Sequence, residues 1–159
     1  MSRIVSVRSG GQTGADRAAL DVAGARGLPL AGWVPLGGWA EDRPEPPGLL
    51  PDYPFLRETD SRDPAYRTRL NVRDSDATLI VDPVPGRSSP GTDLTLAAAC
   101  EYGRPVFESD GQDAEAVIRW LMSIEGDIQL NVAGPRESEV PGTYAAVCSL
   151  LGAVFDRML

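Results

Sequence analysis

The chain repeats one pattern: a short run rich in apolar residues, a loop with glycine, and the start of a helix. Residues 3–8 alternate and are rich in Ile and Val, residues 77–81 are continuously apolar, and residues 128–132 form a third such run. Strands that alternate with helices predict a mostly parallel sheet covered by helices on both faces. We therefore expect an α/β protein with a Rossmann-like, three-layer architecture.

The length of 159 residues predicts a single domain that spans residues 1–159. Further strands are predicted at residues 30–34 and 105–108, and the predicted helices follow the spacing of their apolar residues. The stretch 35–60 is rich in Pro and Gly and is longer than an ordinary connection, so we expect a functional or disordered loop. The helices are expected at residues 15–26, 64–73, 92–102, 113–124 and 141–158.

Charge and composition exclude several kinds of chemistry. The net charge is −8, which argues against a general nucleic-acid-binding surface. All fifteen basic residues are arginine and there is no histidine, so a Walker lysine, a Schiff-base lysine, a Ser-His-Asp triad and a histidine metal site are all absent. No apolar run is long enough to span a bilayer, and no secretory signal is visible, so we expect a cytoplasmic protein without membrane contacts.

The first loop covers residues 9–16 and follows the first predicted strand. Its glycines allow a close backbone approach to a ligand, and the N-terminus of the next helix favours an anion. Gln12 and Thr13 add side-chain hydrogen bonds, and Asp16 would either cap the helix or bind a ligand hydroxyl. The alternative is a purely structural glycine turn.

Two other loops have the same setting. In residues 88–95, Thr92 or Thr95 would donate to phosphate-like oxygens, whereas the alternative is a plain N-cap at Thr92. In residues 131–138, Arg136 would bind a planar anion, whereas the alternative is a salt bridge to Glu137 or Glu139.

Parallel strands bring their carboxyl ends together, so the three loops are expected to meet at one ligand site. Two other groups are candidates for this site. Arg67 and Asn71 share a helix face that would be either a wall of the ligand site or a solvated or structural face, and we favour the second interpretation. Glu41 and Asp42 would form a rim over the ligand or only aid solubility.

The predicted ligand-binding residues are Gly10, Gly11, Gln12, Thr13, Gly14, Asp16, Arg17, Gly91, Thr92, Thr95, Asn131, Gly134, Pro135, Arg136, Glu137 and Ser138, with no catalytic and no metal-binding residue.

Segments along nearly the whole chain resemble one family. The sequence resembles the putative molybdenum carrier family, also described as the circularly permuted YpsA-like branch of the SLOG superfamily. The segments that carry the resemblance are Ser9–Leu20, Gly32–Pro35 with Ala40–Asp42, Arg67–Thr68 with Asn71–Val72, Ser75–Ile80, Gly91–Thr92 with Thr95, and Leu130–Ser138.

This resemblance implies a fold related to the lysine-decarboxylase-like phosphoribohydrolases, ligands derived from nucleotides, and homo-oligomers such as dimers or tetramers. Those hydrolases carry Pro-Gly-Gly-x-Gly-Thr-x-x-Glu, in which the Glu is catalytic. Alignment on Gly91 and Thr92 puts Thr95 at the position of that Glu. The loss of the carboxylate removes the acid/base group for cleaving an N-glycosidic bond.

We therefore expect a non-catalytic binding or carrier protein for a phosphorylated heterocycle, with molybdenum cofactor (molybdopterin) as the first candidate ligand and a nucleotide as the second. The protein would recognise the pterin and the phosphate, because neither cysteine lies in a predicted loop and histidine is absent. The long loop would cover the ring, with Trp39 as a candidate contact. One alternative is a nucleotide-processing hydrolase that uses Asp16, Asp93 or Glu137. The other is a sensor domain for a nucleotide ligand.

Overall fold

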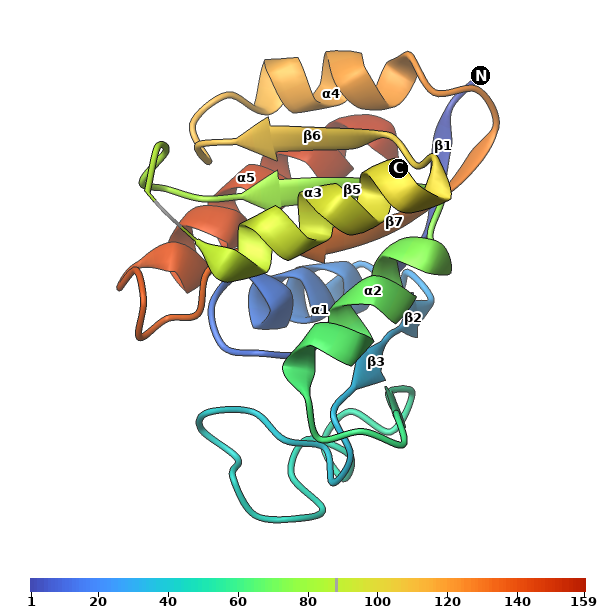
Figure 1. Ribbon diagram of the computed structural model, residues 1–159. Coiled ribbons are helices and arrows are strands. Elements are labelled where there is room, and N and C mark those ends of the chain that lie inside the picture. Colours follow the sequence, from blue (N-terminus) through green and yellow to red (C-terminus); the bar gives the residue numbers. More distant parts are fainter. Residues whose placement is uncertain (88) are drawn as a thin grey trace.

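The computed structural model describes residues 1–87 and 89–159, and a five-stranded parallel sheet forms its centre (Figure 1). The strand order is β2-β1-β7-β5-β6, and every neighbouring pair is parallel. The α/β fold predicted from the alternating pattern is therefore confirmed. The strands are β1 (Arg3–Arg8), β2 (Leu30–Ala31), β5 (Ala77–Val81), β6 (Val106–Ser109) and β7 (Asp127–Ala133).

Helices cover both faces of the sheet, as Figure 1 shows. On one face α1 and α4 each pack against α5, and on the other α2 packs against α3. The buried sheet residues Leu79, Val81 and Leu130 share the main core with apolar side chains of α1, α4 and α5. The helices are α1 (Ala15–Ala25), α2 (Pro64–Arg73), α3 (Pro90–Tyr102), α4 (Ala114–Met122) and α5 (Thr143–Met158). None of those in the described part of the chain has the length and apolar character that crossing a bilayer requires.

The strand predicted at residues 30–34 is in fact two strands in two sheets. β2 ends at Ala31, and β3 (Trp33–Val34) pairs with β4 (Arg57–Glu58) in a separate two-stranded sheet. Gly32 lies at the break, where a Cβ atom would stand 1.8 Å from the carbonyl oxygen of Ser9. The close backbone contact there leaves room only for glycine at the position where the chain passes from the main sheet to the small one.

The Pro- and Gly-rich stretch packs on the domain through its own small core. Leu49 and Leu56 are buried with Leu20 of α1 and Val34 of β3. The sequence prediction of a functional or disordered loop missed β4, which lies within this stretch. The aromatic residues Tyr53 and Phe55 pack against the same cluster, so the stretch is fixed on the domain.

The sheet has a switch point at its centre. The connection through α1 leads from β1 toward one edge of the sheet, and the connection through α3 leads from β5 toward the other edge. β7 lies between β1 and β5, so the ends of these three strands form the crevice where such sheets bind ligands.

Candidate functional site

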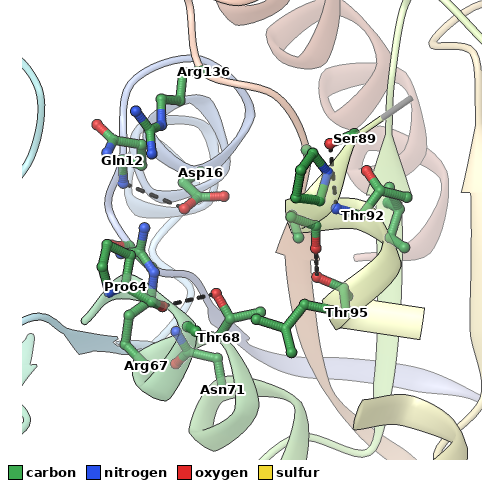
Figure 2. Close-up of a pocket in the computed structure, with 18 of the residues that line it drawn as sticks. Gln12, Asp16, Pro64, Arg67, Thr68, Asn71, Ser89, Thr92, Thr95 and Arg136 are labelled. Atoms are coloured by element: carbon green, nitrogen blue, oxygen red, sulfur yellow. Dashed lines mark hydrogen bonds between the residues drawn. The ribbon is translucent and has the colours of Figure 1, made fainter. Parts of the chain in front are cut away.

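A cavity of about 410 Å³ lies at the carboxyl ends of β1, β5 and β7. The first loop, α2, the start of α3 and the end of β7 form its walls, and Figure 2 shows their side chains facing the same space. Its volume is within the range of small-molecule sites. The three loops predicted to meet therefore do meet, although Ser88 of the second loop is outside the described residues.

The structure divides the predicted ligand-binding residues into two groups. Those that line the cavity are Gly10, Gln12, Asp16, Gly91, Thr92, Thr95, Asn131, Gly134 and Arg136. Those that do not line it are Gly11, Thr13, Gly14, Arg17, Pro135, Glu137 and Ser138. The residues of the second group connect the loops to one another or to the long loop, as their contacts show.

Gly14 joins the first and third loops through their backbones. It precedes α1 with a φ of 78°, and an added Cβ atom would lie 2.4 Å from the carbonyl oxygen of Pro135. That oxygen accepts a hydrogen bond from the amide of Ala15 at 3.3 Å. Gly11, with a φ of 72°, faces Leu49 of the long loop, where a Cβ atom would lie 2.9 Å from Cδ1. These glycines are therefore required for packing between loops.

Glu41 connects the long loop to both the first and the third loop. Its carboxylate accepts hydrogen bonds from the hydroxyl of Thr13 and from the amide and hydroxyl of Ser138, at 3.3 and 2.6 Å for Ser138. Its own amide donates to Oε1 of Gln12 at 2.9 Å, and the Thr13 hydroxyl accepts from the amide of Glu137 at 3.1 Å. Burial alone would raise the pKa of Glu41, but the Ser138 and Thr13 bonds lower it.

Arg17 and Asp42 form a second connection of this kind. Two guanidinium nitrogens of Arg17 each lie 2.9 Å from an Asp42 oxygen, and Nε donates to the carbonyl of Gly11 at 3.1 Å. The guanidinium also lies 5.6 Å from the centre of the Tyr53 ring. Glu41 and Asp42 therefore fix the long loop in place, a role that neither sequence interpretation, a rim over the ligand or solubilising charges, includes.

The polar face of α2 lines the cavity, which the sequence analysis gave as the less favoured of two interpretations. Arg67 and Asn71 are 6% and 3% exposed, so a solvated role for them is wrong. Asn71 has a structural role, because its amide accepts from and donates to the backbone of Trp33 at 2.8 and 3.0 Å. Arg67 donates through Nη1 to the carbonyl of Gly10 at 2.6 Å. No carboxylate among the described residues forms an ion pair with Arg67, and burial lowers its pKa.

Asp16 is the buried carboxylate of the cavity. Burial raises its pKa to about 6, and the neighbouring Arg67 guanidinium and the Gln12 amide only partly offset this effect. Oδ2 accepts from the amide of Gln12 at 3.3 Å. The Gln12 side chain is held through Oε1, which accepts from Thr13 and Glu41, and its Nε2 is buried with no hydrogen-bond partner among the described residues. Asp16 therefore offers a hydrogen-bond acceptor and Gln12 a hydrogen-bond donor on the same wall of the cavity.

The start of α3 forms the opposite wall. Ser89 is its N-cap, and its hydroxyl accepts from the amide of Thr92 at 3.3 Å, so the N-cap expected at Thr92 is wrong by three residues. The signal was present in the sequence, because Ser89 precedes Pro90 at the first helical position. Thr95 is buried and donates to the carbonyl of Gly91 at 2.9 Å. Thr92 lines the cavity with the first turn of the helix.

Arg136 extends from the third loop at the edge of the cavity. Its guanidinium lies 5.7 Å from the centre of the Trp39 ring, and Nε is 3.9 Å from a Glu139 oxygen. The alternative salt bridge to Glu139 is therefore present in a loose form. The carboxylate of Glu137 instead accepts from the amides of Gly142 and Tyr144 at 2.7 and 2.8 Å, at the start of α5. Trp39 does not line the cavity and belongs to a neighbouring groove.

These features define an α/β protein with a polar cavity at the switch point of a parallel sheet. The chain belongs to the circularly permutated YpsA SLOG family, whose model matches residues 7–155. It is also similar to a solved structure, a putative molybdenum carrier protein from Syntrophus aciditrophicus SB. The two chains are 39% identical, the TM-score is 0.83, and the match covers 97% of this chain and 96% of the other. A search of curated proteins found no match.

Proposed function

We propose that this protein binds and carries a phosphorylated heterocycle, with molybdenum cofactor as the first candidate and a nucleotide as the second. The observation that carries the proposal is the composition of the cavity. The N-terminus of α3 on one wall, the buried Arg67 on the other and Arg136 at the edge all face one space. The helix N-terminus and the Arg136 guanidinium favour a phosphate, and the volume beside Arg67 suits a ring with a polar edge.

The likeness to a protein named as a molybdenum carrier supports the choice of the first candidate ligand. The donor set supports recognition through the organic part of that ligand. No group of three or more His, Cys, Asp or Glu residues that could hold a metal ion occurs in residues 1–87 and 89–159. The polar side chains of the cavity suit hydrogen bonding to a phosphate and a heterocycle.

The hydrolase alternative depends on a single carboxylate. Of Asp16, Asp93 and Glu137, Asp93 is exposed and does not line the cavity, and Glu137 is bonded to the start of α5. Among these three, Asp16 is the one that lines the cavity. Thr95, at the position of the hydrolase glutamate, has a hydroxyl with no acid/base function at neutral pH and already donates to Gly91.

Calorimetric titration with purified molybdenum cofactor, GMP, AMP and inorganic phosphate tests the proposal. We expect at least one phosphorylated heterocycle to bind, and Arg136→Ala to weaken that binding about tenfold or more, as the loss of a charge-assisted bond implies. Arg119→Ala is the matched control, because Arg119 is an exposed arginine of α4 that does not line the cavity.

Two results would contradict the carrier function. One is the absence of binding by every ligand in the series. The other is release of free base from a nucleoside monophosphate that stops in Asp16→Asn, since this would show a hydrolase. A chromatographic assay for free base after incubation with GMP or AMP detects the second result.

A further inference from the structure

The wall of the cavity formed by the first loop and α2 presents an acceptor next to donors. Both charged groups lie beside Gly10, where an added Cβ atom would stand 2.9 Å from Arg67 Nη1 and 2.9 Å from Asp16 Oδ2. Asp16 and Arg67 are each more than nine-tenths buried, and the ion pairs among the described residues do not include one between them. Two opposite charges held apart in a buried wall are suited to a ligand that bonds to both.

This wall holds one acceptor and several donors that form no hydrogen bond among the described residues. Asp16 uses Oδ2 for the Gln12 amide, and Oδ1 has no partner among the described residues. The Arg67 guanidinium makes one hydrogen bond, to Gly10, and the other nitrogens have none in the described part of the chain. Gln12 adds a buried amide donor that has no partner among residues 1–87 and 89–159. The wall therefore suits a ligand that offers neighbouring hydrogen-bond donors beside an acceptor such as a carbonyl.

We infer that Asp16 and Arg67 recognise a lactam edge with an adjacent amino group, the edge shared by guanine and the pterins. The carboxylate of Asp16 accepts from the ring N–H and the amino group, and Arg67 donates to the ring carbonyl. The phosphate lies across the cavity at the start of α3, where Ser89 and Thr92 stand in Figure 2. This inference rests on the proposed function and adds the class of heterocycle to it.

A series of monophosphates that differ only in the base tests the inference. GMP offers Asp16 two donors, IMP offers one, and AMP has an amino group but no lactam. We expect GMP to bind at least tenfold more tightly than AMP, with IMP between them, because each lost charge-assisted bond costs about tenfold or more. A pterin phosphate, such as neopterin monophosphate, has the same lactam edge and amino group as GMP on a different ring system. Its affinity relative to that of GMP therefore shows whether the site prefers a pterin or a purine nucleotide.

The variant Asp16→Asn should reverse the preference between two bases. Substitution of a residue with a merely structural role would not do so. In the wild type the backbone amide of Gln12 donates to Oδ2 of Asp16. In the variant the Asn oxygen takes the position of Oδ2, and the NH₂ group of the Asn side chain faces the cavity. XMP has a carbonyl in place of the guanine amino group and fits that NH₂ donor. We expect Asp16→Asn to prefer XMP over GMP and wild type to prefer GMP over XMP. Asp93→Asn, on the exposed face of α3, is the control and keeps the wild-type order.

The outcomes separate this inference from the function on which it rests. Equal affinities for GMP, IMP and AMP, or an equal loss for all of them in Asp16→Asn, would overturn the lactam edge and place Asp16 on the ribose, while ligand binding itself would stand. Preference for AMP would also overturn it. Failure of every monophosphate, the pterin phosphate and the molybdenum cofactor to bind would overturn both the inference and the proposed function.

Discussion

Asp16 should destabilise the free protein at neutral pH, and Asp16→Asn should remove this effect. Burial raises the pKa of Asp16 from 3.8 to about 6, so the folded protein holds its proton more tightly than the unfolded chain. A carboxyl with a raised pKa gives stability that is present at low pH and is lost as the pH rises through the folded value. At 1.36 kcal/mol for each pKa unit, the ionised group costs the fold about 3 kcal/mol above pH 7.

The pH dependence makes this cost measurable. Linkage with these two pKa values gives a penalty of about 1.6 kcal/mol at pH 5 and about 3 kcal/mol at pH 8. The advantage of Asp16→Asn over wild type should thus grow by about 1.4 kcal/mol across this range. Asn keeps an oxygen for the Gln12 amide, so the substitution retains the hydrogen bond.

Urea unfolding of both proteins at pH 5 and pH 8, without ligand, measures this difference. Asp93→Asn serves as the control, since Asp93 is exposed and its substitution should give the same small change at both pH values. A free-energy difference between wild type and Asp16→Asn that is constant with pH, or a variant less stable than wild type at pH 8, would refute the argument from burial.

Three further substitutions test the packing and the loop contacts. Gly134→Ala should lower the free energy of unfolding by at least about 2 kcal/mol, because the new Cβ atom would lie 2.2 Å from a carbonyl oxygen of β5. Gly91→Ala meets no such contact and is the control, and thermal unfolding compares the two variants. Glu41→Gln should speed amide hydrogen exchange in the long loop and cost about 1–2 kcal/mol, and unchanged exchange there would contradict its connecting role. Ser89→Ala should cost about 1 kcal/mol through loss of the α3 cap, and an unaltered unfolding midpoint would argue against that cap.

The main features of the fold were predictable because the signals are local. A buried strand such as residues 77–81, a glycine at the next turn and a helix of regular spacing all lie within short stretches of sequence. Parallel pairing then puts the three loops at the same edge of the sheet, and the observed order β1-β7-β5 brings them to one cavity. The cap at Ser89 was also local, and the Ser-Pro pair was sufficient to identify it.

The remaining features of the site depend on contacts that are distant in sequence. Spacing placed Arg67 and Asn71 on one helix face, but only the packing of α2 beside Trp33 and Gly10 shows that this face is buried. Glu41 lies 28 residues from Thr13, and no pattern in either segment indicates their hydrogen bond. For the same reason the first loop contributes fewer cavity-lining groups than its polar sequence suggests.

Chemical-shift mapping of the labelled protein during titration with GMP tests the central claim most directly, because it reports where a phosphorylated heterocycle binds. We predict saturable shifts of the backbone amides of Gly10, Gly91 and Gly134, which stand on three separate walls of the cavity. Their coincident movement with one affinity would show a ligand between the three loops. Shifts confined to residues outside this cavity, or no saturable shift up to millimolar concentration with GMP, a pterin phosphate and the molybdenum cofactor alike, would contradict the account.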